Sequence, residues 1–260
     1  MKIPFTKAHG AKNDFLLTWA SEIPGEDLPA IARAICNRHT GAGADGWLVV
    51  SPAIAGCHGK IRLFNSDGSE PEMSGNGTRC AAAFLIEAGL ADSTVSILTG
   101  AGRKEIRLLQ RNGYHYLFEM NMGPAIVEEL RGTLLDLPVT VVNVGNPQCA
   151  VFVDDFSLDW RTIGARMEAH PRFPNKTNVS FVKVVDGHTI DVRFFERGVG
   201  ETMSSGTGAT GAAASALARG EVSSPVQIET PAGTLNLRVQ EDDLYLVGPV
   251  EIVVKGEFFL

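Results

Sequence analysis

The sequence lacks any long hydrophobic run and any excess of positive charge. No apolar stretch approaches the roughly 20 residues that a membrane-spanning helix needs, and residues 1–7 are too polar for the core of a signal peptide. The chain carries 23 lysines and arginines against 30 acidic residues, a formal net charge of −7. This balance argues against nucleic acid and anionic membranes as partners. We therefore expect a cytoplasmic protein that binds neither nucleic acid nor a membrane.

Cysteine is scarce as well, and its positions exclude the common metal motifs. Cys36, Cys57, Cys80 and Cys149 match no CxxC spacing, so the sequence predicts free, buried thiols and no metal site. The rest of the composition is ordinary, with 44% hydrophobic and 20% charged residues in a chain of 260. That length suits one large domain or two domains of about 130 residues.

Glycine, in contrast, is plentiful and unevenly distributed. Two glycine-rich segments stand out, which we call the N-terminal nest (residues 74–78) and the C-terminal nest (residues 205–209). Their opening serines, Ser74 and Ser205, lie 131 positions apart, and the same offset relates the segments that flank them. The matching segments are 62–65 with 193–196, 81–83 with 212–214, Gly89 with Gly220, 95–99 with 226–230, and 101–102 with 232–233. This repeat predicts two homologous halves, residues 1–125 and 126–260, with the last strand returning to the N-terminal half as an open alternative.

Each half shows the same order of a strand, a glycine-rich nest, an alanine-rich helix and further strands. The helices predicted after the nests, at 78–88 and 209–218, are apolar nearly all round, which is typical of buried helices. Gly89 and Gly220 stand where a left-handed helix cap belongs. We also expect helices at 28–36 and near 160–168. The predicted strands are 15–18, 47–50, 60–64, 95–98, 105–109, 114–120, 139–144, 150–153, 180–185, 189–195, 226–229, 235–239 and 245–254.

This pattern predicts an α+β fold of two pseudo-symmetric halves, each a mostly antiparallel β-sheet wrapped round a central helix. Each central helix would begin at a nest, where backbone N–H groups and the helix dipole attract a carboxylate or a phosphate. Phosphate binding is disfavoured because the nests lack the spacing and lysine of a P-loop and the dinucleotide pattern. Close helix packing alone would account for Gly77 and Gly208, but poorly for the hydroxyl that opens each nest. The remaining interpretation is catalysis on a carboxylate-bearing substrate, with one opening residue on each face of its α-carbon, as inversion of a stereocentre requires.

Several long motifs extend over nearly the whole chain. They are residues 9–15 (HGAKNDF), 38–46 (RHTGAGADG), 64–80 (FNSDGSEPEMSGNGTRC), 144–147 (VGNP), 178–179 (NV) and 196–202 (ERGVGET). In these motifs and in their order the sequence resembles the diaminopimelate epimerase family. The resemblance implies a pyridoxal-independent isomerase without cofactor or metal, which interconverts LL- and meso-2,6-diaminopimelate. It also implies a small amino-acid substrate as partner and a homodimer, because the family's enzymes are often dimers.

The resemblance further implies a role for each matched residue. Ser74 and Ser205 would be the catalytic pair. Asn13, Asn65, Asn146 and Asn178 would bind the substrate through their amides, while Gly75, Asn76, Gly206 and Thr207 would donate N–H groups to the reacting carboxylate. Glu196 and Arg197 would meet the distal amino-acid head, although taken alone they could equally form an ion pair with each other.

The departures from the family fall on the chemistry itself. The family has cysteine where this chain has Ser74 and Ser205, usually histidine where it has Gln148, and often cysteine where it has Thr210. A thiol has a reference pKa of about 8.5, whereas a hydroxyl is weaker by several units and needs an adjacent base. No histidine is near either serine in the sequence. Each exchange should therefore cost about two to four powers of ten in rate.

The serines have two alternative origins. One is deliberate replacement of cysteine to trap a bound substrate, which would not account for the further departures at Gln148 and Thr210. The other is natural divergence. A diverged chain could bind an amino acid without racemising it. It could also be a related isomerase or dehydratase that uses a carboxylate base, with Asp45, Asp67 and Glu72 as candidates.

Overall fold

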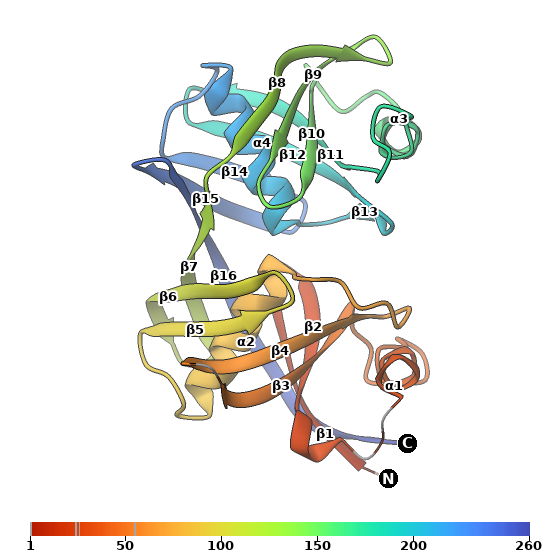
Figure 1. Cartoon of the computed structure of the whole chain (residues 1–260), viewed down its shortest axis with the longest axis vertical. Coiled ribbons are helices and arrows are strands. Elements are labelled where there is room, and N and C mark those ends of the chain that lie inside the picture. Colours follow the sequence, from red (N-terminus) through yellow and green to blue (C-terminus); the bar gives the residue numbers. More distant parts are fainter. Residues whose placement is uncertain (1, 24, 26, 55) are drawn as a thin grey trace. The chain divides into compact units, whose positions relative to one another are not determined.

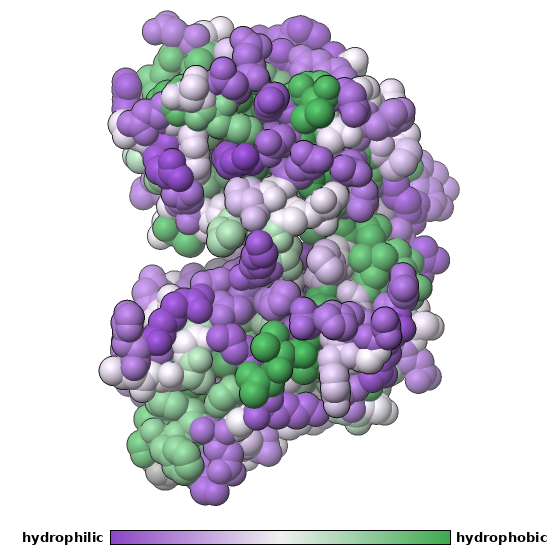
Figure 2. Space-filling model, turned by 180° about the vertical axis from the view of Figure 1, so that it is seen from behind, coloured by the Kyte–Doolittle hydropathy of each residue, from purple (hydrophilic) through white to green (hydrophobic). Residues whose placement is uncertain are grey.

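The computed structural model describes residues 2–23, 25, 27–54 and 56–260. The chain divides into two compact units: unit 1 comprises Met1–Met120 and Gly248–Leu260, and unit 2 comprises Asn121–Val247. Each unit consists of strands arranged round one helix (Figure 1). The molecular face drawn in Figure 2 is mostly hydrophilic, with separate hydrophobic spots. No helix in the described part of the chain is long and apolar enough to cross a membrane.

Unit 1 is a sheet that closes on itself. Its strands are β1 (Lys2–Gly10), β2 (Asn13–Trp19), β3 (Gly46–Ile54), β4 (Cys57–Asn65), β5 (Thr94–Thr99), β6 (Gly102–Asn112), β7 (His115–Gly123) and the C-terminal part of β16 (Asp243–Phe259). They are hydrogen-bonded in that order, and β16 pairs with β1 to complete the ring. The β2–β3 and β4–β5 pairs are parallel. The β1–β2, β3–β4, β5–β6 and β6–β7 pairs are antiparallel.

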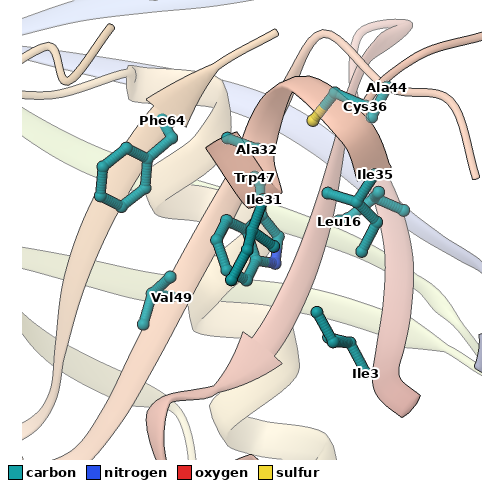
Figure 3. Packing of buried hydrophobic residues seen from close by; sticks show 10 residues of the cluster. All are labelled: Ile3, Leu16, Ile31, Ala32, Ile35, Cys36, Ala44, Trp47, Val49 and Phe64. Atoms are coloured by element: carbon teal, nitrogen blue, oxygen red, sulfur yellow. The ribbon is translucent and has the colours of Figure 1, made fainter. Parts of the chain in front are cut away.

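The helix α2 (Gly75–Glu87) contacts β1 to β5, and its residues from Gly75 to Ile86 are all buried. The prediction of a buried apolar helix is thus confirmed. The helix begins three residues earlier than predicted, because Ser74 caps it and the glycines of the nest form its first turn. A shorter helix, α1 (Leu28–Ile35), packs on β3 and β4 through a separate cluster that includes Ile31, Trp47 and Phe64 (Figure 3). A single 3-10 turn, η1 (Ala20–Glu22), follows β2.

Unit 2 has its own strands round a central helix, in an order that runs from β16 to β8 without a closing pair among the described residues. They are β8 (Ile126–Leu134), β9 (Leu137–Asn143), β10 (Pro147–Phe152), β11 (Asn178–Asp186), β12 (Thr189–Glu196), β13 (Gly200–Thr202), β14 (Val226–Thr230), β15 (Gly233–Gln240) and the N-terminal part of β16. The order is β16-β15-β14-β12-β11-β10-β9-β8, with β13 paired to β12. The β10–β11 and β12–β14 pairs are parallel, and their places in the unit match those of β2–β3 and β4–β5.

The central helix of unit 2, α4 (Gly206–Ala218), contacts strands from β8 to β15. The helix α3 (Trp160–Glu168) packs on β11 and β12, as α1 does in unit 1. The glycines that follow both central helices have positive φ, 71° at Gly89 and 72° at Gly220, and so form the predicted left-handed caps. The predicted fold class, a mostly antiparallel sheet round a central helix in each half, is therefore confirmed.

Candidate functional site

In unit 1 the N-terminal nest is the first turn of α2. Ser74 is extended, with φ −126° and ψ 127°, and its Oγ accepts a hydrogen bond from the Gly77 N–H at 3.1 Å. By helix geometry the N–H groups of Gly75 and Asn76 have no acceptor inside the helix. The first turn therefore presents two backbone donors at the positive end of the helix dipole, an arrangement suited to a carboxylate.

A chain of side-chain hydrogen bonds leads away from this first turn. Arg79 Nη2 donates to Asn76 Oδ1 at 2.5 Å, and Asn76 Nδ2 donates to Asn13 Oδ1 at 3.2 Å. Asn13 Nδ2 in turn donates to Asp45 Oδ2 at 2.8 Å. Asn13, a predicted substrate-binding amide, is thus in direct contact with the side chain of Asn76, a predicted backbone donor, beside the capped end of α2.

Asp14 lies next to this chain in a cluster of charges. Its carboxylate accepts a hydrogen bond from Arg38 at 2.7 Å and lies 3.0 Å from Lys7 Nζ, and Arg38 also reaches Asp45 at 2.7 Å. Burial alone would raise the pKa of Asp14, but the hydrogen bonds from Arg38 and Lys7 outweigh it and hold the pKa below its ordinary value. Asp14 is therefore ionised at neutral pH and contributes to the stability of unit 1.

Asn65, at the end of β4, stands apart from this chain. Its Nδ2 donates to Ser69 Oγ at 2.9 Å, and no hydrogen bond among the described residues joins it to Asn13 or Asn76. Of the three carboxylates predicted as alternative bases, Asp45 is hydrogen-bonded by Arg38 and Asn13, and Asp67 by Ser69, while Glu72 is exposed. Among the described residues none of the three forms a hydrogen bond with Ser74.

In unit 2 the C-terminal nest has the same backbone and different chemistry. Ser205, with φ −135° and ψ 126°, accepts a hydrogen bond from the Gly208 N–H at 3.1 Å. Its Oγ also donates to Glu196 Oε2 at 2.9 Å, while Thr202 Oγ1 donates to Glu196 Oε1 at 2.7 Å. Burial raises the pKa of Glu196, and the two hydroxyl donors oppose that rise without cancelling it. A carboxylate with a raised pKa in contact with a hydroxyl is a candidate proton acceptor.

The remaining predicted residues of unit 2 form a connected set round this nest. Asn146 Nδ2 donates to Thr207 Oγ1 at 3.3 Å, and Gln148 Nε2 donates to Asn146 Oδ1 at 2.8 Å. Asn178 Nδ2 donates to the Pro147 carbonyl at 3.0 Å. Gln148 is 1% exposed and its Oε1 has no hydrogen-bond partner. It therefore fixes Asn146 but, as an amide, supplies no base.

Arg197 is exposed and does not pair with Glu196. Its N–H donates to Asn178 Oδ1 at 3.1 Å and its Nη1 to the Asn175 carbonyl at 3.4 Å. Because the Glu196 carboxylate is held by two hydroxyls instead, the alternative of a mutual ion pair is wrong. The role of both residues at a distal amino-acid head remains a prediction.

Sequence reasoning missed two residues, Glu196 as the partner of Ser205, and Arg79. The search for a base considered histidines close in sequence, whereas Glu196 reaches Ser205 from the end of β12. The repeat contains a signal for both residues, because its offset aligns Glu196 with the neutral Asn65 and Arg79 with the neutral Thr210. At these two positions the halves differ in charge.

The four cysteines do not substitute for the missing thiols. All four are buried and free, as predicted. Burial raises the pKa of Cys36, Cys80 and Cys149 to about 12, which makes these thiols inert at neutral pH. Among the described residues no group of three or more His, Cys, Asp or Glu side chains could hold a metal ion.

Two surface hollows lie away from both nests. One, of about 620 Å³, is lined in unit 2 by residues such as Phe152, Val182 and Arg219. The other, of about 340 Å³, is lined in unit 1 by residues such as Phe5, Trp19 and Phe84. Neither is lined by Ser74 or Ser205, so we base the candidate site on the capped helix ends.

Comparison with known proteins agrees with this duplicated fold. The structure is similar to a probable proline racemase from Agrobacterium radiobacter, with a TM-score of 0.76 and 16% identity over 98% of this chain and 92% of that chain. It is also similar to a methylitaconate-delta-isomerase, with a TM-score of 0.71 and 13% identity over 99% and 95% of the two chains. At such low identity these likenesses define the fold alone, one shared with racemases and isomerases.

Sequence comparison identifies the family. The sequence model of the diaminopimelate epimerase family matches residues 5–128 and 140–253. The chain is 38% identical to a diaminopimelate epimerase of Moorella thermoacetica over 276 residues, 98% of each chain. It is likewise 38% identical to one of Synechocystis over 280 residues, 99% of each chain. The chain therefore belongs to the diaminopimelate epimerase family.

Proposed function

We propose that this protein is a cofactor-independent amino-acid epimerase that interconverts LL- and meso-2,6-diaminopimelate, slowed by serine at both catalytic positions. The observation that carries the proposal is the matched pair of capped helix ends. Each offers a serine hydroxyl beside backbone N–H donors at the start of a buried helix. The full-length similarity to curated diaminopimelate epimerases supports the same substrate for this chain.

In the proposed reaction each unit offers its own donors to a substrate carboxylate: the N–H groups of Gly75 and Asn76 in unit 1, and those of Gly206 and Thr207 in unit 2. Ser205 Oγ accepts the α-proton as its own hydroxyl proton passes to Glu196, and the C–H electron pair stays on the substrate as a carbanion. Ser74 then donates its hydroxyl proton to the opposite face and recovers a proton from solvent, while Glu196 releases to solvent the proton that it accepted, so that both groups return to their starting state. The nearby N–H donors and the helix dipoles stabilise the charge that develops next to the carboxylate.

The two serines are unequal in this scheme. Ser205 has Glu196 as proton acceptor, whereas Ser74 has no carboxylate in contact among the described residues. Because a free hydroxyl is a poor acid near neutral pH, proton delivery by Ser74 limits epimerisation. Removal and return of the α-proton on the Ser205 face proceeds without that step.

The other parts of the site bind and orient the substrate. The resemblance to the family supports Asn13, Asn65, Asn146 and Asn178 as ligands of its polar groups and Arg197 as a ligand of its distal amino-acid head, whereas the hydrogen bond from Ser205 gives Glu196 the role of proton acceptor instead. The exposed apolar side chains of Val253, Val254 and Phe259 on β16 support a homodimer. The protein acts in the cytoplasm.

The decisive experiment restores the thiols. The Ser74→Cys/Ser205→Cys protein and the unaltered serine protein are incubated with LL-diaminopimelate in D₂O, and NMR follows α-deuterium content and the LL to meso ratio. We expect the double variant to epimerise faster by roughly 10⁴-fold or more, at two to four powers of ten for each exchange. A double variant that neither exchanges deuterium nor epimerises would refute the proposed function.

A binding protein on the same scaffold is the second candidate, and Gln148 favours it. A buried amide stands where the family usually has histidine, and it is tied to Asn146 rather than free for proton transfer. This candidate predicts saturable binding of diaminopimelate by calorimetry and no turnover. Any epimerisation by the native chain, measured over days at high protein concentration, excludes it.

A further inference from the structure

Arg79 is a buried charge without a counter-ion. Its side chain is 0% exposed, and no ion pair joins it to any carboxylate in the described residues. Its single hydrogen bond runs from Nη2 to Asn76 Oδ1, while Nε and Nη1 have no partner. Burial lowers its pKa to about 10, so the guanidinium is still charged at neutral pH. An unpaired buried cation is strongly disfavoured in folded proteins, and its presence calls for a functional cause.

The charge lies at the ligand-binding end of α2. Side chains on a helix lean toward its N-terminus, and the contact with Asn76 places the Arg79 guanidinium beside the first turn. The same turn presents the N–H groups of Gly75 and Asn76 and the positive end of the helix dipole. Two sources of positive potential therefore meet at one place, the Arg79 guanidinium and the dipolar end of the helix with its free N–H groups, and no carboxylate among the described residues forms an ion pair with Arg79.

The hydrogen bond from Arg79 to Asn76 and the one from Asn13 to Asp45 fix the orientation of the two amide groups between them. Arg79 is only a donor, so the atom of Asn76 that it contacts must be Oδ1, and Nδ2 must then face Asn13. At the other end Asp45 is only an acceptor, so Asn13 must present its Nδ2 there. A cation at one end and a carboxylate at the other thus hold both amides in one orientation.

The equivalent position in unit 2 carries no charge. Thr210, offset from Arg79 by the repeat, is buried, and its Oγ1 donates to the Gly206 carbonyl at 2.8 Å inside its own helix. The two central helices share backbone and cap, so the difference at this position is chemical rather than architectural.

We propose that Arg79 is a positioning residue whose buried charge is the counter-charge of the substrate carboxylate at the N-terminal nest, acting through Asn76. Unit 1 is then the half that selects an ionised acid group, and unit 2 the half that holds the base. Arg79 does not touch the substrate, because it is fully buried. This inference rests on the proposed function, in that it assumes that a carboxylate occupies the nest.

The test uses the full chain with Ser74→Cys/Ser205→Cys as parent, so that turnover can be measured. Arg79→Gln in this parent keeps a donor for Asn76 and removes the charge. We expect KM for diaminopimelate to rise at least about tenfold, as for loss of an interaction with a charged group, with kcat changed less than about threefold. Arg79→Lys should restore most of the affinity. Thr210→Val, the matched neutral change in unit 2, should leave KM unchanged.

Stability separates this role from a purely structural one. Removing an uncompensated buried charge relieves its desolvation, so the Arg79→Gln protein should melt at the same temperature as the parent or higher. A variant that is unfolded, or that melts well below the parent, overturns the proposal, as does an unchanged KM. An inactive parent would instead refute the proposed function, and the inference with it.

Discussion

The first turns of α2 and α4 have the same backbone and opposite chemistry. Both begin at an extended serine whose Oγ accepts an N–H from the third helical residue at 3.1 Å. In the first turn after Ser74 the buried cation of Arg79 donates to Asn76, whereas Ser205 itself donates to the carboxylate of Glu196. The two helix ends are thus equivalent in backbone and differ in the charged group that contacts their first turn. Architecture alone therefore does not assign roles to the two serines.

The largest expected effect tests the base in unit 2. Glu196→Gln in the native chain keeps the shape of the side chain and removes the proton acceptor of Ser205. We expect α-deuterium exchange of diaminopimelate to fall by about 10²-fold or more, measured by NMR or mass spectrometry over long incubations.

Thr202→Val is the matched control, because it removes the other hydroxyl on Glu196 and leaves the contact with Ser205. Its exchange rate should stay within about tenfold of the native rate, since one neutral hydrogen bond contributes about 1 kcal/mol. Equal losses in both variants, or none in Glu196→Gln, would contradict the difference between the halves.

A second comparison concerns how tightly each helix end is packed. A Cβ on Gly208 would lie 2.8 Å from Phe194 Cδ1 and 2.9 Å from Ser205 Cβ, whereas one on Gly77 would lie 3.3 Å from Ser74 Cβ. We expect Gly208→Ala to destabilise unit 2 by about 1–3 kcal/mol through overpacking. Gly77→Ala should be neutral, or stabilise unit 1 by up to about 1 kcal/mol through helix propensity.

Hydrogen exchange of the core amides of each unit, followed by mass spectrometry, measures both effects without assuming that the chain unfolds as one unit. Equal protection losses in the two variants would show that the nests are packed alike.

The smallest expected effect is on stability: substitutions of Asp14 and Glu196 should change the stability of their units in opposite directions at neutral pH. The pKa of Asp14 in the folded protein is lower than its ordinary value of 3.8. Its ionised carboxylate therefore stabilises unit 1 at neutral pH, and this stabilisation is lost as the pH falls through the folded pKa. Asp14→Asn should therefore destabilise unit 1 by about 2 kcal/mol at pH 7, between the values for exposed and buried pairs. The deficit should shrink in acid, because the native carboxyl is then protonated too.

The pKa of Glu196 in the folded protein is higher than its ordinary value of 4.5. Ionising this buried carboxyl therefore destabilises unit 2, an effect that is absent in acid and appears as the pH rises from 4.5 through the folded pKa. Glu196→Gln should therefore stabilise unit 2 at pH 7, and the gain should vanish as the pH falls to about 4.5. Amide-exchange protection against pH measures both trends, and the same sign in both variants would refute this account.

Much of the fold was predictable, because its elements carry local signals. The helix α1 was predicted at 28–36 and runs over Leu28–Ile35, and α3 was predicted near its observed span of Trp160–Glu168. Three strands were missed: β1, β8 and the three-residue β13. In β8 most side chains are exposed, so no alternation marks it, and β1 is completed by pairing with the far end of the chain.

The candidate site was predictable only in part. Motif resemblance named residues that do contact one another, such as Asn13 with Asn76 and Asn146 with Thr207. It did not indicate that Glu196 contacts Ser205, nor that Arg79 is buried without a counter-ion. Both facts depend on which side chains of β12 and α2 face inward once the sheets close.

The sequence by itself determined the duplication, the two alanine-rich helices, their serine caps and the family, because these depend on local spacing and composition. Only the tertiary structure decided which charge stands beside each cap. Burial and hydrogen bonding, which set the electrostatics of Arg79 and Glu196, exist only after residues distant in sequence pack against one another.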